Sequence, residues 1–250
     1  GARPSLGKTS LALDIARHAA LKANVPVGLF SLEMSREQVI DRLISAESQV
    51  PLWRLRTGRI NDDSEFEMIQ HSLDKLSGAP IYVDDSSSPN IMQIKAMSRR
   101  LQIEHGLGLV VVDYLQLIMP RTHSDNMVNQ VTEISRGLKQ LARELKVPVL
   151  ALSQLSRGVE QRDHKQPRLS DLRDSGSIEQ DSDVVLFIYR KDRDRTDISV
   201  PLEEQNMAQV IVAKHRNGPL GSVDLRFDPD RVSFKNVDKR FENVPAEASI

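Results

Sequence analysis

The chain has 250 residues, with 34 Lys and Arg against 35 Asp and Glu, so its formal net charge is −1. A chain of this length can bury one substantial core, which favours a single large α/β domain over two small ones. The balanced charge lacks the basic excess that marks many nucleic-acid-binding proteins, so any such contact must be local. The absence of cysteine excludes disulfides, thiolate zinc sites and a cysteine nucleophile, and it fits a cytoplasmic protein.

The amino end of the chain carries a phosphate-loop pattern. Residues 2–9 match GxxxxGK[ST], except that Ala2 takes the first glycine position and Gly1 stands one place early. In such a loop the following helix points its positive end at phosphates, Lys8 reaches the outer phosphates and the Thr9 hydroxyl ligates Mg²⁺. The alternative is a solvent-exposed turn that happens to contain Gly-Lys-Thr. The predicted ATP-binding residues here are Ala2, Arg3, Pro4, Ser5, Leu6, Gly7, Lys8, Thr9 and Ser10.

A buried strand normally feeds a phosphate loop, and Gly1 opens directly into the loop, so we expect the first strand of the sheet to be missing. Apolar spacing then predicts helices over 9–22, from 35, and over 65–76, 91–105 and 128–145. Ser35 and Gln38 form a capping box, and Gly106 stops a helix. Predicted strands cover 27–32, 81–83, 109–112, 149–152, 184–189, 208–213 and 222–227. This alternation predicts an α/β fold with a mostly parallel central sheet flanked by helices and a terminal β-hairpin.

Other segments lack the pattern of core elements. Residues 154–180 are polar, with Pro167 and two glycines, and we expect long functional loops there. We divide the chain into a domain over 1–235 and a tail over 236–250, and we expect Trp53 to serve packing. The most apolar stretch, 107–119, is too short to cross a bilayer, and the first residues contain no signal peptide.

Polar residues follow three of the predicted buried strands. Asp113 ends one of them, at the sheet edge where such folds bind ligands, and can hold Mg²⁺ through water. A lone strand-end Asp is more often a cap or turn residue, but its pairing with the phosphate loop favours the metal role. Hydrolysis also needs a group that deprotonates water, for which Glu33 is the candidate; its alternative role is a favourable charge at the next helix start. Gln154 either senses the γ-phosphate or is an ordinary loop residue.

Seven blocks together resemble the C-terminal RecA-like motor domain of DnaB-type bacterial replicative DNA helicases. They run in that family's order from the first residue to about residue 220, which makes the match far more specific than a phosphate loop alone. Alanine at position 2 is common in that family. The blocks are residues 2–9, Phe30–Met34, Val111–Leu117, Leu152–Arg157, Asp171–Asp181, Phe187–Arg190 and Lys214–Pro219.

The resemblance implies roles for several residues around ATP. Glu33 would be the catalytic base, Arg42 a γ-phosphate contact, Asp113 the Mg²⁺ carboxylate and Gln154 the coupling residue. Cations on a projecting hairpin can stabilise phosphoryl charge in a neighbouring subunit, as arginine fingers do. Lys214 and Arg216 would be such cations, and a solvated basic turn is the alternative.

For DNA, the resemblance points to the loop that contains Arg173, Asp174 and Gly176, although the family usually has glutamate in place of Asp174. Basic side chains and backbone N–H groups without aromatic platforms imply sequence-independent, salt-sensitive binding to phosphates. Nearby basic residues either add to the same channel or belong to a solvated loop. These are Arg157, Arg162, Lys165 and Arg168.

The predicted function is therefore that of an ATP-dependent helicase motor that forms a homohexameric ring on single-stranded DNA. The family resemblance alone implies 5′–3′ movement and the partners primase and helicase loader. One alternative is a RecA-like recombinase, against which the Asp171–Asp181 and Lys214–Pro219 blocks argue. A second is a non-motor assembly and partner-binding module, against which the complete set of expected catalytic residues argues.

Overall fold

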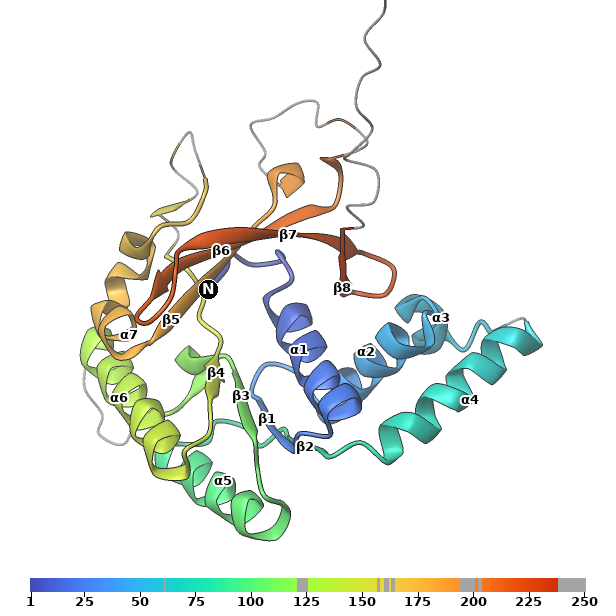
Figure 1. The fold of residues 1–250 in the computed structure, drawn as a ribbon, viewed down its shortest axis with the longest axis horizontal. Helices are drawn as coiled ribbons and strands as arrows, with labels where there is room; N and C mark the ends of the chain where they lie inside the picture. The colour runs from blue at the N-terminus through green and yellow to red at the C-terminus, as the bar shows by residue number, and fades with distance from the viewer. Residues whose placement is uncertain are drawn as a thin grey trace, which may run out of the picture.

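The computed structural model describes residues 1–60, 62–120, 126–156, 158–159, 162, 165–193, 201 and 204–237, except for the side chains of 173–175. The chain is an α/β protein with two four-stranded sheets, one parallel and one antiparallel (Figure 1). Most of the helices pack around the parallel sheet. None of the helices in the described ranges is long and apolar enough to cross a membrane.

The parallel sheet has the order β2-β1-β3-β4. Every residue of β1 and β3 is buried, as expected for apolar strands covered on both faces. Ser31 pairs with Asp113 in the register of these two strands, so their carboxyl ends lie side by side. The strands are β1 (Val27–Ser31), β2 (Ile81–Asp84), β3 (Leu109–Asp113) and β4 (Val149–Ala151).

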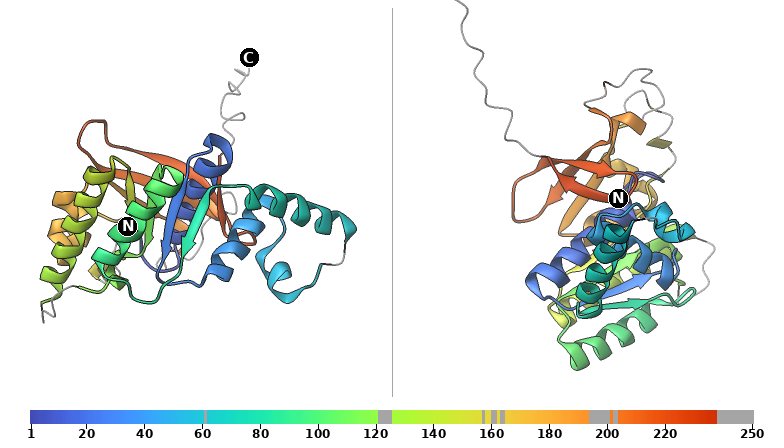
Figure 2. Two further views of the ribbon diagram at one scale, coloured as in Figure 1. Left: turned by 90° about the horizontal axis from the view of Figure 1, so that it is seen from below. Right: turned by 90° about the vertical axis from the view of Figure 1, so that its right-hand side faces the viewer.

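Helices cover both faces of the parallel sheet because successive strand residues point to opposite sides. Leu29 and Val111 pack with α1 (Lys8–Ala23) and α2 (Arg36–Ser48). Phe30, Val110 and Val112 pack in a second core with α5 and α6. Figure 2 shows α3 and α4 extending beyond α2 at one end of the molecule. The remaining helices of this half are α3 (Leu52–Thr57), α4 (Asp63–Ser77), α5 (Ile91–His105), α6 (Met127–Leu145) and the short η1 (Leu115–Leu117).

The antiparallel sheet has the order β5-β6-β7-β8. Its inner face packs on the start of the chain, where Ala2 and Leu6 share a small core with Phe227 and Phe234. Its strands are β5 (Val184–Tyr189), β6 (Met207–His215), β7 (Gly221–Asp228) and β8 (Ser233–Asn236), and the short helices beside it are η3 (Leu169–Ser175), α7 (Gly176–Asp181) and η4 (Lys191–Arg193).

The first two residues join the two sheets. The Ala2 amide donates to the Ser153 carbonyl at 3.3 Å, and the Leu155 amide donates to the Ala2 carbonyl at 3.3 Å. On the other side, the Ile188 amide of β5 donates to the Gly1 carbonyl at 3.2 Å. In the part of the chain that the structure describes, α1 is the first helix or strand.

Most predicted elements are confirmed, including the Ser35–Gln38 capping box, the left-handed Gly106 and the β6–β7 hairpin. The predicted strand at 184–189 lies in the antiparallel sheet, where it pairs with β6. Residues 238–250 lie outside the described residues, so the division into a domain and a tail stays a prediction.

Two expectations were wrong. Trp53 is 49% exposed on α3, with the Arg54 guanidinium 5.4 Å from its ring centroid, so it does not serve the core. The polar segment 154–180 was expected to be loops, but η3 and α7 form within it. Asp171 accepts from the Arg168 amide at 2.7 Å at the start of η3, a capping contact that composition alone does not reveal.

Candidate functional site

The phosphate-loop segment curves tightly before α1. Ser5 and Gly7 have φ angles of 64° and 94°, which lie in the left-handed region. A Cβ atom on Gly7 would come within 2.8 Å of the Phe234 ring. Glycine is therefore required at this position for two reasons, its backbone angle and the close approach of β8.

The Asp113 carboxylate lies next to the first residues of α1. The Thr9 hydroxyl donates to its Oδ2 at 2.6 Å, and the Lys8 ammonium lies 3.8 Å from its Oδ1. Lys8 also lies 4.0 Å from the centroid of the Tyr114 ring. Burial lowers the pKa of Lys8, and the opposing effects of Asp113 and Glu33 are smaller. The structure thus brings two phosphate-loop side chains onto one buried carboxylate.

Strand ends place Glu33 and Gln154 beside this cluster. After β1, the Leu32 amide donates to the Asp113 carbonyl at the end of β3, at 2.7 Å. The next residue, Glu33, lines the pocket. After β4, the Gln116 side chain donates to Ser153 Oγ at 2.9 Å and accepts from the Gln154 amide at 3.4 Å. Gln116 was not predicted as a site residue, although it belongs to the block around Asp113.

Lys8, Thr9, Glu33 and Gln154 line a pocket of about 410 Å³, whereas Asp113 and Gln116 do not line it. Leu6 is buried in the small core beneath the loop and does not line it. Sequence reasoning missed Met34, Phe227 and Val232, which give the pocket an apolar wall. The lining residues are Ala2, Arg3, Pro4, Ser5, Gly7, Lys8, Thr9, Ser10, Glu33, Met34, Arg42, Gln154, Phe227 and Val232.

Arg42 brings a further cation to the pocket from α2. Burial is the main cause that lowers its pKa; Arg56 lowers it further, and Asp113 and Glu33 oppose the shift. Two partly desolvated cations, Lys8 and Arg42, therefore line the same cavity. Such an arrangement attracts an anion more strongly than solvated surface charges do.

Lys214 and Arg216 do not line this pocket. They lie at the end of β6 and in the turn of the β6–β7 hairpin, beside α7. The Lys214 ammonium donates to the Glu179 carbonyl, and the Arg216 guanidinium donates to the Gln180 carbonyl at 2.8 Å. Arg216 also lies 3.2 Å from Asp183 Oδ1, and its side chain is 46% exposed. The structure thus keeps Lys214 and Arg216 apart from the chain's own pocket, although Phe227 of the same hairpin lines it, and leaves Arg216 accessible.

Of the predicted DNA-contacting residues, Gly176 begins α7 and is exposed. The backbone of Arg173 and Asp174 lies in η3, and their side chains fall outside the described residues, as does Arg157.

The other basic residues of this segment differ in their surroundings. The Arg162 guanidinium donates to Asp171 Oδ2 at 2.6 Å, and Lys165 is buried. Lys165 is therefore not part of a solvated loop, whereas Arg162 is held by an ion pair.

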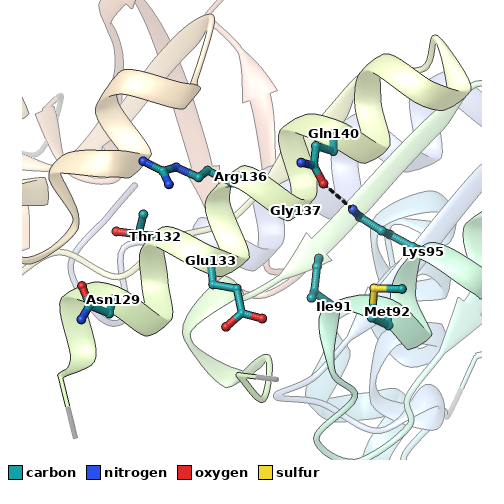
Figure 3. A pocket seen from close by; sticks show the side chains of 9 residues that line it. All are labelled: Ile91, Met92, Lys95, Asn129, Thr132, Glu133, Arg136, Gly137 and Gln140. Carbon is teal, nitrogen blue, oxygen red and sulfur yellow. Dashed lines mark hydrogen bonds between the residues drawn. The ribbon is translucent and has the colours of Figure 1, made fainter. Parts of the chain in front are cut away.

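A second pocket, of about 460 Å³, lies between α5 and α6 (Figure 3). The Lys95 ammonium donates to Gln140 Oε1 at 2.9 Å across it. It contains none of the predicted site residues, and it lacks the glycine-rich loop and strand-end acid of the first pocket. The first pocket is therefore the candidate functional site.

A loop that opens a helix with Gly-Lys-Thr, beside an acid at the end of a parallel strand, defines the class of P-loop nucleotide-binding proteins. Comparison with known families places the chain within that class. Residues 1–236 match the family described as DnaB-like helicase C terminal domain, and the chain belongs to this family.

Similar proteins and structures agree with this family. The chain is 48% identical over 244 residues to a replicative DNA helicase DnaB of Geobacillus stearothermophilus, and 46% identical over 244 residues to a replicative DNA helicase DnaC of Bacillus subtilis (strain 168). Each match covers 97% of this chain and 53% of the relative, so the chain spans about half the length of these relatives.

Two solved structures superpose with a TM-score of 0.88 at 38% identity and cover 95% of this chain. One is a DnaB-like replicative helicase described together with its interactions with primase, of which 56% is matched. The other is described as an ATPase domain, of which 83% is matched.

Proposed function

We propose that the chain is the motor domain of an ATP-dependent replicative DNA helicase. A homohexameric ring of such chains would translocate on single-stranded DNA and unwind the duplex at the replication fork. The observation that carries the proposal is the pocket that gathers Lys8, Glu33 and Gln154, together with an exposed Arg216 that stands outside it. A nucleotide site that is complete within one chain would not need Arg216, so the position of Arg216 outside the pocket supports a site that a neighbouring chain completes.

The residues at the phosphate loop fit Mg²⁺. Thr9 and Asp113 offer hard oxygen donors, and Asp113 Oδ1 is a buried acceptor without a hydrogen-bond partner. Within the described ranges no three His, Cys, Asp or Glu side chains form a group that could hold a metal ion, so Mg²⁺ here would need phosphate and water oxygens as further ligands. Thr9 and Asp113 would hold the ion, mainly through water. When bound, Mg²⁺ neutralises charge on the phosphate oxygens.

The remaining pocket residues divide the work on ATP. Lys8 and Arg42 would bind the outer phosphates, because both cations line the cavity. Glu33 would orient a water molecule and accept its proton, because its exposed carboxylate lines the same cavity as Lys8 and Arg42. Gln154, whose backbone is fixed by Gln116, would report the state of the γ-phosphate to the segment that follows β4.

Groups outside the pocket would act on neighbours and on DNA. Arg216, supported by Lys214, would reach the phosphates bound by an adjoining subunit and stabilise their charge during hydrolysis. The segment around Arg173, Asp174 and Gly176 would follow the DNA backbone. We further propose primase and a helicase loader as partners, a cytoplasmic location and 5′–3′ movement, all of which rest on the family.

The test is ATP turnover of the chain with Mg²⁺, measured with and without single-stranded DNA. We expect DNA to stimulate turnover in the parent, Lys8→Ala to abolish it, and Lys22→Ala, an exposed lysine of the same helix, to leave it unchanged. Equal turnover in Lys8→Ala and the parent would refute the proposed phosphate site. Electron micrographs with a non-hydrolysable ATP analogue should show rings, whereas open filaments would favour a recombinase.

A further inference from the structure

One wall of the nucleotide pocket comes from the end of the antiparallel sheet. Phe227, the penultimate residue of β7, and Val232, in the turn before β8, line the pocket. Phe234 of β8 packs on Gly7 so closely that a Cβ atom there would clash with its ring. The position of β8 against α1 therefore sets the distance between the phosphate loop and this apolar wall.

Asp14 fastens β8 to α1. It lies in the middle of α1, is only 8% exposed, and accepts from the Ser233 hydroxyl at 2.8 Å and from the Phe234 amide at 2.7 Å. The Arg17 guanidinium, 3.3 Å from its Oδ1, supplies the opposite charge. A buried carboxylate with three donors makes stronger hydrogen bonds than neutral groups do. Both contacts with β8 are made at or directly next to the residue that touches Gly7.

The turn between β7 and β8 is held in an unusual conformation. Val232 has a φ of 50°, which β-branched residues rarely adopt, so the surrounding structure must maintain it. On the far side of the turn, the Asp230 carbonyl accepts from the Leu52 amide at 2.8 Å, and Arg231 Nε donates to the Gln49 carbonyl at 2.5 Å. On the side of the phosphate loop, the hydrogen bonds of Asp14 with Ser233 and Phe234 hold the other end of this turn.

We infer that Asp14 is a positioning residue of the nucleotide site, which holds the Phe227–Val232 wall at the distance that encloses the nucleoside part of the ligand. The inference rests on the proposed function, because it takes the pocket to bind ATP. Lys8, Thr9 and Arg42 are the proposed phosphate contacts, whereas the side-chain hydrogen bonds of Asp14 go to Ser233, Phe234 and Arg17. Its loss should therefore weaken the binding of ATP while sparing the binding of a phosphate chain that has no nucleoside.

The variant Asp14→Asn tests this inference. It keeps the size of the side chain but replaces one acceptor oxygen with an NH₂ group, which cannot accept a hydrogen bond from Ser233 or Phe234. Calorimetry would measure the Kd of the chain for a non-hydrolysable ATP analogue and for inorganic tripolyphosphate, both with Mg²⁺. We expect the Kd for the analogue to rise roughly tenfold and that for tripolyphosphate to stay within about twofold. Glu144→Gln, which weakens the exposed pair between Arg99 of α5 and Glu144 of α6, is the matched control and should change neither Kd.

Equal weakening of both ligands would overturn the inference, because it would mean that Asp14 only stabilises the phosphate loop; unchanged binding of both would overturn it as well. Ser233→Ala removes a single donor and decides the question if Asp14→Asn does not fold, with an expected rise of roughly threefold for the analogue alone. A parent chain that binds neither ligand would instead refute the proposed function.

Discussion

The two sheets contribute chemistry in different ways. In the parallel sheet, Glu33, Asp113 and Gln154 follow or end the neighbouring strands β1, β3 and β4, and the strand register alone brings them to one edge. In the antiparallel sheet, Lys214 and Arg216 lie at one end of a hairpin, held by α7 and outside the pocket. The first arrangement assembles a site within one chain, and we propose that the second presents cations to a neighbouring subunit.

The largest expected effect distinguishes residues of the chain's own pocket from cations that act on a neighbouring chain. Arg216→Ala should lower ATP turnover of the assembled ring about 1,000-fold while leaving ATP binding by each chain unchanged, because Arg216 does not line its own pocket. Turnover assays and calorimetry would measure the two quantities. Arg226→Ala, an exposed arginine of β7, is the control.

Mixing variants sharpens the same comparison. A mixture of Arg216→Ala and Lys8→Ala chains should regain part of the turnover, because a chain with an intact hairpin can serve a neighbour with an intact pocket. If the mixture stays as inactive as the separate variants, the hairpin does not act between subunits.

Stability should also differ between the sheets. Leu29 of β1 is 2% exposed, and Leu29→Ala should lower the free energy of unfolding by about 3 kcal/mol. Val223 of β7 is 57% exposed, and Val223→Ala should change it by less than about 0.5 kcal/mol. Denaturant titrations of both variants would show this, and similar losses would mean that the outer face of the second sheet is covered in solution.

The next effect tests the edge of the parallel sheet. Glu33→Gln should slow turnover about 100-fold, which is about 2.7 kcal/mol, and leave ATP binding intact, because it removes only the proton acceptor. Glu37→Gln, in the first turn of α2, is the control. If Glu33→Gln instead lowers stability and spares turnover, Glu33 serves the helix dipole of α2 and is not the base.

The smallest effect concerns the cap that follows Glu33. Ser35 accepts from the Gln38 amide and starts α2, so Ser35→Ala should cost about 1 kcal/mol of stability. Ser35→Gly should cost only a few tenths of that. Thermal unfolding of both variants would check the order, and equal losses would show that the cap bond contributes little.

The site residues of the parallel sheet could be predicted because local patterns encode them. Buried strands, a phosphate loop and the polar residue at each strand end are all visible within a few neighbouring positions, and parallel pairing then brings the ends together. Phe227 and Val232 could not be found in this way, because they reach the pocket through antiparallel pairing with strands far from the loop in sequence.

Other features depend on tertiary contacts that cannot be read from amino-acid composition. Trp53 lies on a helix of six residues, which is too short for an apolar pattern to show which face is buried. Its hydrophobicity alone therefore could not indicate that its side chain is exposed. The start of η3 depends on Asp171, which also binds Arg162. Asp14 stands in an apolar helix, and nothing nearby in the sequence points to its partners in β8.

The pairing of Gly1 with β5 and of Ala2 with the residues that follow β4 makes the entry to the phosphate loop a direct link between the two sheets. If one sheet rotates against the other, these two residues must move with both sheets. Under the proposed function, a rotation of the sheet that carries the hairpin would therefore reach the backbone that is proposed to hold the phosphates.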